Sequence, residues 1–186
     1  MVRRTPPDLY RGVVNTDPVL ARAEALITTV PDFPAPGVEF RDISPLLADD
    51  PALAAVAEAL VAPFHGTFDV VAGLEARGFL LAGYIAARTG VGMLPIRKAG
   101  KLPRPAASVS YDLEYGSATI EAPDVLRPGD RVLVLDDVLA TGGTLAATRT
   151  LLGHLGAEVV GAAVVLELEA LGGRDVCGDV HSVFRG

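Results

Sequence analysis

Two adjacent carboxylates, Asp136 and Asp137, follow an apolar, β-branched run and precede a loop of small residues. The loop consists of Ala140, Thr141, Gly142, Gly143 and Thr144. Glycine lets backbone N–H groups approach an anion closely, and the helix expected after the loop adds the positive end of its dipole. The threonine hydroxyls add further hydrogen-bond donors. These residue types in this order predict a phosphate-binding loop.

The two carboxylates need partners other than the phosphate. Adjacent residues of a strand point to opposite faces, so Asp136 and Asp137 are expected to do different work. A ribose diol can donate hydrogen bonds to a carboxylate, and a hydrated Mg²⁺ is a second natural partner. Phosphate, diol and carboxylates together indicate a ribose 5-phosphate. The alternative is a generic phosphate loop with aspartates beside it by coincidence; the spacings of a Walker A loop and of a dinucleotide fingerprint are both absent.

Positive charge gathers in one short segment of this acidic chain, whose formal net charge is −7. The segment 97–104 holds four cations and no acid: Arg97, Lys98, Lys101 and Arg104. Such a run is either a solvated face or an anion site, and its isolation in an acidic chain favours the anion site. Arg77 stands between a predicted strand and a predicted helix, where it can donate to an anion or form an ordinary ion pair.

Composition bounds the remaining possibilities. The chain has 186 residues, half of them apolar, and is predicted to fold as one domain over residues 1–186, with a variable N-terminus at residues 1–15. The net negative charge argues against general nucleic-acid binding. The sequence carries neither a secretory signal nor an apolar stretch of ~18 residues, so a cytoplasmic protein without a membrane partner is expected. Cys177, the single cysteine, cannot form an internal disulfide.

Short apolar strands that alternate with helices predict a parallel α/β sheet. Strands are expected at residues 68–73, 91–96, 131–135, 158–166 and 179–184. Helices are expected at residues 17–29, 50–62, 78–88 and 144–155, the first two capped by Asp17 and Asp50. Residues 31–47 are expected to form a loop. Residues 97–122 break the alternation and are predicted to form a long β-arm, with its turn near Gly116, that acts as a lid.

Residues 133–144 resemble the motif by which type I phosphoribosyltransferases bind 5-phosphoribosyl-1-pyrophosphate (PRPP). Further segments match the family in the right order: residues 31–43, 73–79, 96–103 and 111–116. The resemblance spans about residues 31–170 and implies an α/β fold: a mainly parallel sheet flanked by helices, a β-arm lid and a small base-binding hood. The sequence Leu-Glu-Tyr-Gly at 113–116 and Phe-Pro-x-Pro-Gly at 33–37 are typical of members that act on adenine.

The resemblance implies a reaction and a division of labour. The 5-phosphoribosyl group would pass from PRPP to adenine, giving AMP and pyrophosphate, with Mg²⁺ as cofactor. The loop 140–144 would grip the 5-phosphate, and Asp136 and Asp137 would serve the ribose, with contact to the metal at most through water. Pyrophosphate would lie against four cations: Arg77, Arg97, Lys98 and Lys101.

The resemblance also implies catalytic and base-binding residues. Glu114 is expected near N7 of adenine as a general acid or an anchor, and Arg77 is the second residue expected to take part in catalysis. The adenine pocket is expected to use Glu39, Phe40, Arg41, Val138 and Leu168. The alternatives are a solvated strand position for Glu114 and a core position for Phe40. Because members of the family form homodimers, a homodimer is expected.

Two rival functions remain open at this point. One is a phosphoribosyltransferase for another base, although those families generally lack the Leu-Glu-Tyr-Gly segment. The other is a non-catalytic regulator that binds PRPP without turnover. Such regulators usually carry an added DNA-binding domain, for which this chain has neither the length nor the basic charge.

Overall fold

The computed structural model describes residues 17–112 and 116–186. The chain divides into two compact units, residues 1–55 and 56–186, and each is described by itself. The predicted catalytic Glu114 lies outside the described residues, as do residues 1–15.

The first unit begins with helix α1 (Pro18–Ala25), whose predicted cap is confirmed: the Asp17 carboxylate accepts a hydrogen bond from the Val19 N–H at 2.8 Å. The helix was predicted to continue to about residue 29, which is wrong. The β-branched run Thr28–Val30 instead forms strand β1, antiparallel to β2 (Phe40–Asp42).

The segment predicted as a loop at residues 31–47 therefore contains structure of its own. Besides β2 it holds the short helix α2 (Ser44–Leu47). Within this unit the Phe33 and Phe40 rings meet edge to face, with centroids 5.1 Å apart. Helix α3 (Asp50–Val61) follows, and its cap is Asp49 rather than the predicted Asp50, because the Asp49 carboxylate accepts from the Ala52 N–H at 3.1 Å.

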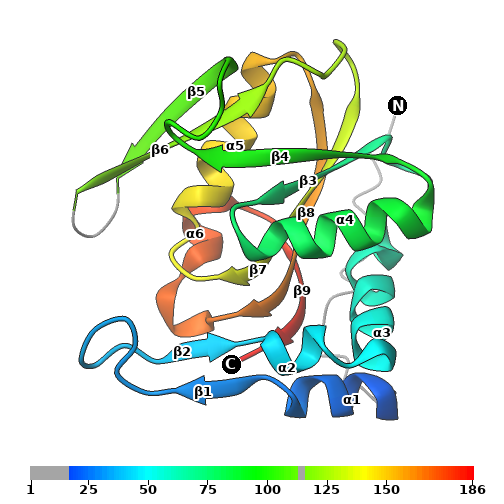
Figure 1. Cartoon of the computed structure of the whole chain (residues 1–186), viewed down its shortest axis with the longest axis vertical. Helices are drawn as coiled ribbons and strands as arrows, with labels where there is room; N and C mark the ends of the chain where they lie inside the picture. The colour runs from blue at the N-terminus through cyan, green and yellow to red at the C-terminus, as the bar shows by residue number, and fades with distance from the viewer. Residues whose placement is uncertain (1–16, 113–115) are drawn as a thin grey trace, which may run out of the picture. The chain divides into compact units, whose positions relative to one another are not determined.

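The second unit is built on a seven-stranded sheet in the order β5-β6-β4-β3-β7-β8-β9 (Figure 1). Its strands are β3 (Val70–Leu74), β4 (Gly92–Lys98), β5 (Pro105–Asp112), β6 (Ser117–Pro123), β7 (Arg131–Leu139), β8 (Glu158–Glu167) and β9 (His181–Arg185). Neighbouring strands in the run β4-β3-β7-β8-β9 pair in parallel, whereas β6 is antiparallel to both β4 and β5. The predicted mainly parallel sheet and β-arm are confirmed.

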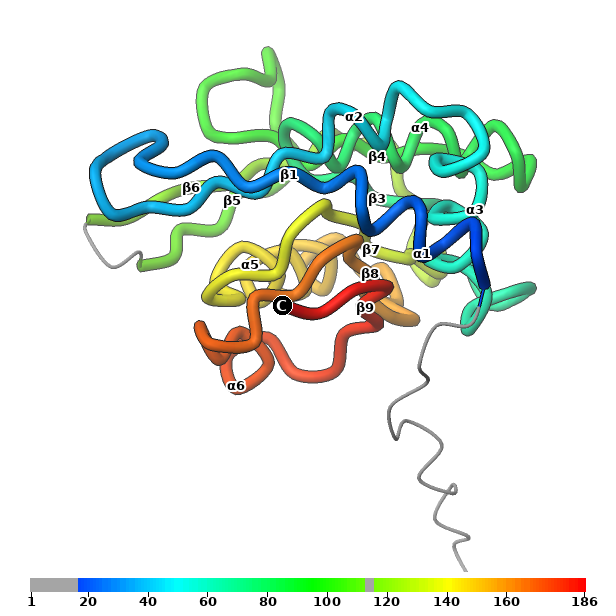
Figure 2. Tube along the Cα trace, turned by 90° about the horizontal axis from the view of Figure 1, so that it is seen from below, coloured from blue at the N-terminus to red at the C-terminus, as the bar shows by residue number. Residues whose placement is uncertain are grey.

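Helices cover both faces of this sheet (Figure 2). Helix α4 (Arg77–Thr89) packs on β3 and β7, and α5 (Gly143–His154) packs on the other face; right-handed crossovers in opposite directions along the sheet require this arrangement. The second unit also contains two 3₁₀ helices, η1 (Ala62–Phe64) and η2 (Glu169–Leu171), and the short helix α6 (Gly173–Cys177). Central strands are buried on both faces, which explains their continuous apolar runs. Buried core residues include Leu94, Ile96, Val132, Val134 and Leu151.

The chain reverses its direction across the sheet between β3 and β7. From β3 the chain crosses to β4 on one side, and from β7 it crosses to β8 on the other, while β3 and β7 themselves are neighbours, with Gly73 opposite Leu135. In open α/β sheets, ligands bind beyond the carboxyl ends of the strands at such a point. The turn that contains Arg77 and the loop that follows Asp137 both leave the sheet here. No helix in the described part of the chain is long and apolar enough to cross a membrane.

Candidate active site

A cavity of about 290 Å³ lies at this edge of the second unit. Its lining comes from β3, β4, the β5–β6 arm, β7 and α5: Leu74, Glu75, Ile96, Lys98, Tyr111, Ala118, Ile120, Asp136 and Thr144. A shallower hollow of about 70 Å³ follows the loop from Asp136 to Leu145 and includes the predicted base-pocket residue Val138. The two hollows share Asp136 and Thr144 in their linings, so the predicted loop and Lys98 of the cationic segment border neighbouring hollows of the second unit.

The phosphate loop depends on glycine for steric reasons. Gly142 has φ +82°, and a Cβ atom there would lie 2.2 Å from the Gly173 carbonyl oxygen. Gly173 is equally constrained, since its Cβ would lie 2.3 Å from the Ala140 carbonyl oxygen. Loop and α6 are therefore in backbone-to-backbone contact, which only residues without a side chain permit. The loop leads directly into α5, whose first turn offers unpaired N–H groups toward the hollow.

An ion pair with a nearly buried carboxylate joins α6 to the end of β8. Arg174 donates from Nε and Nη2 to the two Glu167 oxygens at 2.6 and 2.7 Å, and the Ser182 hydroxyl donates to the same carboxylate at 2.6 Å. Burial alone would raise the pKa of Glu167, but the hydrogen bonds from Arg174 and Ser182 outweigh it and lower the pKa. The sequence analysis assigned no role to these residues. The one available signal was an acid, Glu167, directly after an apolar strand.

The two aspartates lie within β7 rather than beyond it, because the strand continues to Leu139 instead of ending at residue 135 as predicted. Asp136 lines the cavity, and its Oδ1 accepts a hydrogen bond from the Asp137 N–H at 2.9 Å. Burial, together with the neighbouring Asp137 charge, raises the pKa of Asp136 well above the usual aspartate range. Asp137 forms an ion pair with Arg77 Nη2 at 2.7 Å. The two carboxylates thus have different surroundings, as the alternation of a strand predicts.

Glycines bring the first turn of α4 close to β7. A Cβ on Gly78 would lie 2.8 Å from the Leu135 carbonyl oxygen and 3.2 Å from Asp136 Oδ1. A Cβ on Gly73 would lie 2.6 Å from the Gly78 carbonyl oxygen. The turn between β3 and α4 contains a cis peptide bond between Glu75 and Ala76. This packing carries Arg77 to Asp137 and joins the two loops of the site.

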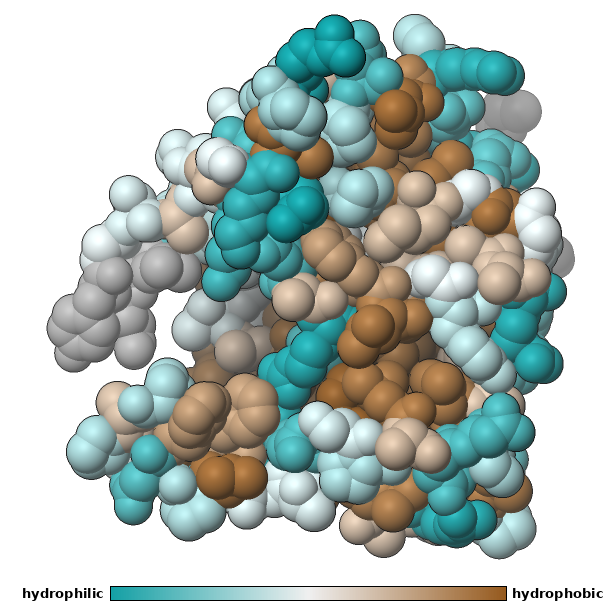
Figure 3. All heavy atoms as spheres, viewed as in Figure 1, coloured by the Kyte–Doolittle hydropathy of each residue, from teal (hydrophilic) through white to brown (hydrophobic). Residues whose placement is uncertain are grey.

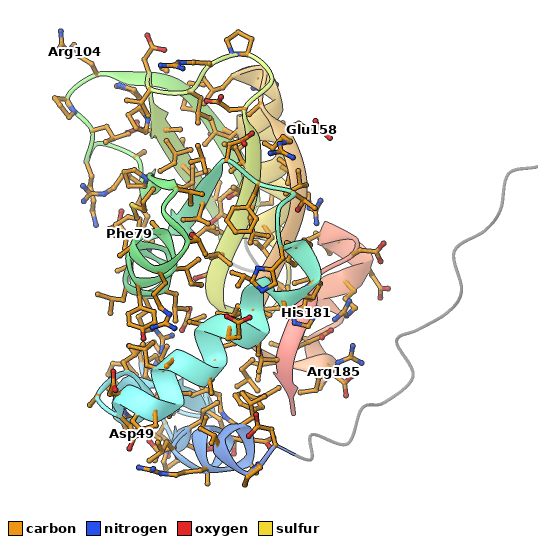
Figure 4. The ribbon with its side chains drawn as sticks, turned by 90° about the vertical axis from the view of Figure 1, so that its right-hand side faces the viewer. Asp49, Phe79, Arg104, Glu158, His181 and Arg185 are labelled. Carbon is orange, nitrogen blue, oxygen red and sulfur yellow. The ribbon has the colours of Figure 1, made fainter. Side chains whose placement is uncertain are left out.

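The cationic segment meets an acid from outside its own sequence. Glu75 accepts from Arg97 Nε at 3.2 Å, from the Lys98 N–H at 2.9 Å and from Lys101 Nζ. Burial opposes ionisation of Glu75, but these hydrogen bonds prevail and lower its pKa to about 2. Hydrophilic residues gather on the surface over the end of β4 (Figure 3). Arg104 is exposed and points outward at the edge of the molecule (Figure 4).

The arm also contacts the phosphate loop. The Tyr111 hydroxyl and the Thr144 hydroxyl are 2.9 Å apart, and a Cβ on Gly143 would lie 3.2 Å from the Tyr111 ring. Sequence reasoning gave no role to Tyr111 or Glu75, although both stood inside matched segments. Nothing in a single sequence shows that one binds a loop threonine and the other a distant cation.

The remaining predicted residues divide between the two units. Leu168 follows β8, and its N–H donates to the Leu139 carbonyl at 2.9 Å, beside the loop of the second unit. Glu39, Phe40 and Arg41 lie in the first unit at β2, where Phe40 is partly buried against Phe33. The alternative prediction, that Phe40 is a buried core residue, is therefore only partly confirmed.

The fit of the site to Mg²⁺ follows from its donors. Within residues 17–112 and 116–186, no group of three or more acid, histidine or cysteine side chains could enclose a metal. Asp136 and Asp137 nevertheless present hard carboxylate oxygens, and Asp137 Oδ2 is buried beside Arg77 Nη2, 2.7 Å away. A metal here would need most of its ligands from substrate oxygens and water, which is how Mg²⁺ commonly binds phosphates.

Comparison with known proteins agrees with this geometry. Residues 46–180 match the model of the phosphoribosyl transferase domain family. Adenine phosphoribosyltransferase of Renibacterium salmoninarum is 58% identical over 153 residues, covering 82% of this chain and 84% of the relative. That of Clavibacter sepedonicus is 54% identical over 185 residues, covering 98% of this chain and 96% of the relative.

Solved structures give the same result. The crystal structure of adenine phosphoribosyltransferase from Rhodothermus marinus has a TM-score of 0.86 at 45% identity, covering 90% of this chain and 98% of the other. The Giardia lamblia APRTase complexed with 9-deazaadenine has a TM-score of 0.84 at 42% identity, covering 90% and 97%.

Proposed function

The chain belongs to the phosphoribosyl transferase domain family, and from that premise we propose that it transfers the 5-phosphoribosyl group of PRPP to adenine, giving AMP and pyrophosphate. The observation that carries the proposal is the junction of β3 and β7. Three features lie side by side there. They are a glycine loop suited to a phosphate, a pair of carboxylates near the end of β7 suited to a ribose, and an arginine after β3 suited to pyrophosphate. The adenine assignment rests on the relatives, which are named for that activity.

PRPP is expected to lie across this junction. Its 5-phosphate would bind the backbone N–H groups and hydroxyls of Ala140–Thr144 at the start of α5. The ribose diol would donate to Asp136 and Asp137, and the pyrophosphate would face four cations: Arg77, Arg97, Lys98 and Lys101. The shared boundary of the cavity, from Lys98 through Asp136 to Thr144, supports this order of groups.

The reaction breaks the bond between C1 of the ribose and the pyrophosphate oxygen while N9 of adenine attacks C1. The electron pair of the broken bond leaves with pyrophosphate, and the N9 proton of adenine passes to solvent water. Positive charge builds on the ring during this exchange, and carboxylates held beside it stabilise that charge more in the transition state than in the ground state. Asp136 and Asp137 are proposed for this work. Arg77 would balance the charge that develops on the leaving group.

Mg²⁺ is part of the proposal as the ion that accompanies PRPP and neutralises charge on its pyrophosphate. Asp136 and Asp137 would contact the Mg²⁺ ion only through water molecules bound to it. Burial and the neighbouring Asp137 charge raise the pKa of Asp136. A cation bound nearby would oppose this shift, because it favours the ionised carboxylate.

The base side of the site is proposed from the family resemblance. Glu39, Phe40, Arg41, Val138 and Leu168 are each proposed to bind adenine, and Glu114 would exchange a proton or a hydrogen bond with N7. The single-domain organisation of residues 1–186, the homodimer, the lid role of the arm and the cytoplasmic location belong to the same proposal.

One assay separates this function from its rivals. Pyrophosphate release should be measured with PRPP and Mg²⁺ and with each base in turn. We expect release with adenine and little with guanine, hypoxanthine, xanthine or orotate, and loss of turnover in excess chelator with recovery on added Mg²⁺. A preference for another base would overturn the adenine assignment. PRPP binding without any release would favour the non-catalytic regulator.

A further inference from the structure

One buried carboxylate lies at the centre of the cations proposed to receive pyrophosphate. The side chain of Glu75 is only 10% exposed, and donors from three residues at the end of β4 and the turn after it converge on it: Arg97, Lys98 and Lys101. Glu75 also lines the cavity itself. This is more than a surface ion pair, because the carboxylate takes both side-chain and backbone donors from one segment.

Three of the cations proposed to face pyrophosphate are already paired with carboxylates. Arg77 faces Asp137 at 2.7 Å, while Arg97 and Lys101 both face Glu75. An anion that enters between these cations must therefore share them with carboxylates that are already there. The pKa of Glu75, about 2, keeps its negative charge in place throughout the neutral range.

We propose that Glu75 is a positioning residue that acts as an internal competitor of pyrophosphate: it holds Arg97 and Lys101 while the subsite is free and weakens the hold of these cations on the leaving group. This inference rests on the proposed function, since it takes pyrophosphate as the anion that these cations meet. As a result, the net positive charge of the pyrophosphate subsite is lower than its cations alone would give. Such a subsite can support bond cleavage and still release the product.

A purely structural role for Glu75 predicts the opposite sign. If the carboxylate only braced the turn after β4, then removing its charge would loosen Arg97 and Lys101 and weaken pyrophosphate binding. If the carboxylate competes with pyrophosphate, removing its charge strengthens binding, because a like charge has been taken away from beside the ligand. The direction of the change therefore decides between the two roles.

The test uses Glu75→Gln, which keeps the size of the side chain and an oxygen that can accept from the Lys98 N–H. Affinity for pyrophosphate with Mg²⁺ should be measured by titration calorimetry and by inhibition against PRPP. We expect binding to tighten on the order of tenfold at low salt, with a smaller gain at high salt because screening already weakens the charge effect in the wild type. Unchanged or weaker binding would overturn the proposal.

Asp69→Asn is the matched control. Asp69 immediately precedes β3, so it lies at the opposite end of that strand from Glu75, and it too pairs with an arginine, Arg131, at 2.7 Å. Its pKa is also lowered to about 2, chiefly by the hydrogen bond from Arg131. The control removes the same charge from the same fold, so it should leave pyrophosphate affinity unchanged. An equal gain in Asp69→Asn would show a general charge effect and would overturn the specific role of Glu75.

A measurement on the wild type keeps the proposal testable if Glu75→Gln does not fold. The Arg97 Nε–H resonance, assigned with Arg97→Lys, should shift when pyrophosphate and Mg²⁺ are added, because the donor moves from Glu75 toward the ligand. A resonance that stays in place at saturating pyrophosphate would overturn the proposal. Wild-type AMP formation is measured separately: its absence would defeat the proposed function, whereas the shift and the tighter binding test Glu75 alone.

Discussion

The two loops that meet at the β3–β7 junction are built on different physical principles. The loop after β7 is rigid because it is held by backbone contact, with Gly142 against Gly173, and the groups proposed to bind phosphate there are N–H donors. The turn after β3 and the end of β4 are held by charge, with two acids among three cations: Glu75, Asp137, Arg77, Arg97 and Lys101. If PRPP binds as proposed, one end of the substrate meets a rigid, uncharged surface and the other end meets a surface of paired charges.

Adding a methyl group to the rigid loop should give the largest effect. Gly142→Ala places a Cβ 2.2 Å from the Gly173 oxygen and forces alanine to φ +82°, a strain of about 1–3 kcal/mol before the clash is counted. We expect the free energy of unfolding to fall by about 3 kcal/mol and kcat/KM for PRPP to fall about 100-fold or more, since small displacements of binding groups are costly.

The control for this change lies on the same helix. A Cβ on Gly153 would meet no atom within 4 Å, so Gly153→Ala should be neutral or raise the free energy of unfolding by about 0.5–1 kcal/mol. Thermal unfolding and initial rates at varied PRPP measure both variants. A fully active Gly142→Ala enzyme would remove the steric half of the comparison.

The ion pair behind the rigid loop is the next largest contribution. Arg174→Met leaves the nearly buried Glu167 with the Ser182 hydroxyl and a distant Arg185, 3.6 Å away. Loss of one partner of a buried pair costs several kcal/mol, and Arg174 is about one-third exposed (34%), so we expect a loss of about 2–3 kcal/mol in unfolding free energy. The KM for PRPP should rise more than the KM for adenine, because α6 supports the phosphate loop.

The same variant should show a defined pH dependence. The folded protein lowers the pKa of Glu167, so the carboxylate stabilises the fold above its ordinary pKa of about 4.3, and that stability is lost as pH falls through the lower folded value. Arg174→Met reduces the shift. Denaturant melts of both proteins should therefore differ most near neutral pH and converge as the solution is made acidic. A constant difference at every pH would show that Arg174 acts by packing alone.

Much of this architecture follows from the sequence, because the strands and helices around the junction have strong local signals. Val132–Leu135 is apolar on both faces, and Gly142-Gly143 marks the start of α5, so the order of strand, loop and helix in this part of the chain was predicted correctly. The β1–β2 hairpin was missed because Thr28–Val30 has only three residues, all exposed, and continues a helical pattern. Short exposed strands gain their stability from pairing, which local propensity does not describe.

The charged half of the site could not be predicted to the same depth. Residues 97–104 contain four cations and no acid, and only the fold brings Glu75 to them across more than 20 positions of sequence. Arg77 and Asp137 were each singled out, but their pairing at 2.7 Å depends on the register of β3 against β7. Residue types and their local order can be taken from the sequence, whereas contacts between distant segments can be identified only in the three-dimensional structure.

Removing the two lysines of the cationic segment tests the charged half directly. Replacing Lys98 and Lys101 together with alanine should raise the KM for PRPP about tenfold at low salt, because these cations are expected to face pyrophosphate, and should leave the KM for adenine nearly unchanged. Lys101 is 47% exposed, so added salt should shrink the penalty by screening the wild-type attraction. Arg104→Ala, at the outward-pointing exposed cation, is the control and should change neither KM. Equal losses in both variants would indicate a solvated face.

The smallest expected effect concerns the contact between the β5–β6 arm and the rigid loop. Tyr111→Phe removes only the hydroxyl that lies 2.9 Å from the Thr144 hydroxyl and keeps the ring against Gly143. A hydrogen bond of this kind contributes about 0.5–1.5 kcal/mol, so kcat/KM for PRPP should fall roughly 2- to 10-fold. Ser110→Ala is the matched control. The Ser110 hydroxyl bonds the Thr119 hydroxyl inside the arm at 2.7 Å, so its removal is expected to leave PRPP kinetics unchanged.

Thr144→Val removes the bond to Tyr111 from the other side. Because both single variants break one interaction, the double variant should lose less than the sum of the two losses. Additive losses would mean that the arm and the loop act independently. In that case Thr144 would serve the phosphate alone, and the arm would gain no order from the rigid half of the site.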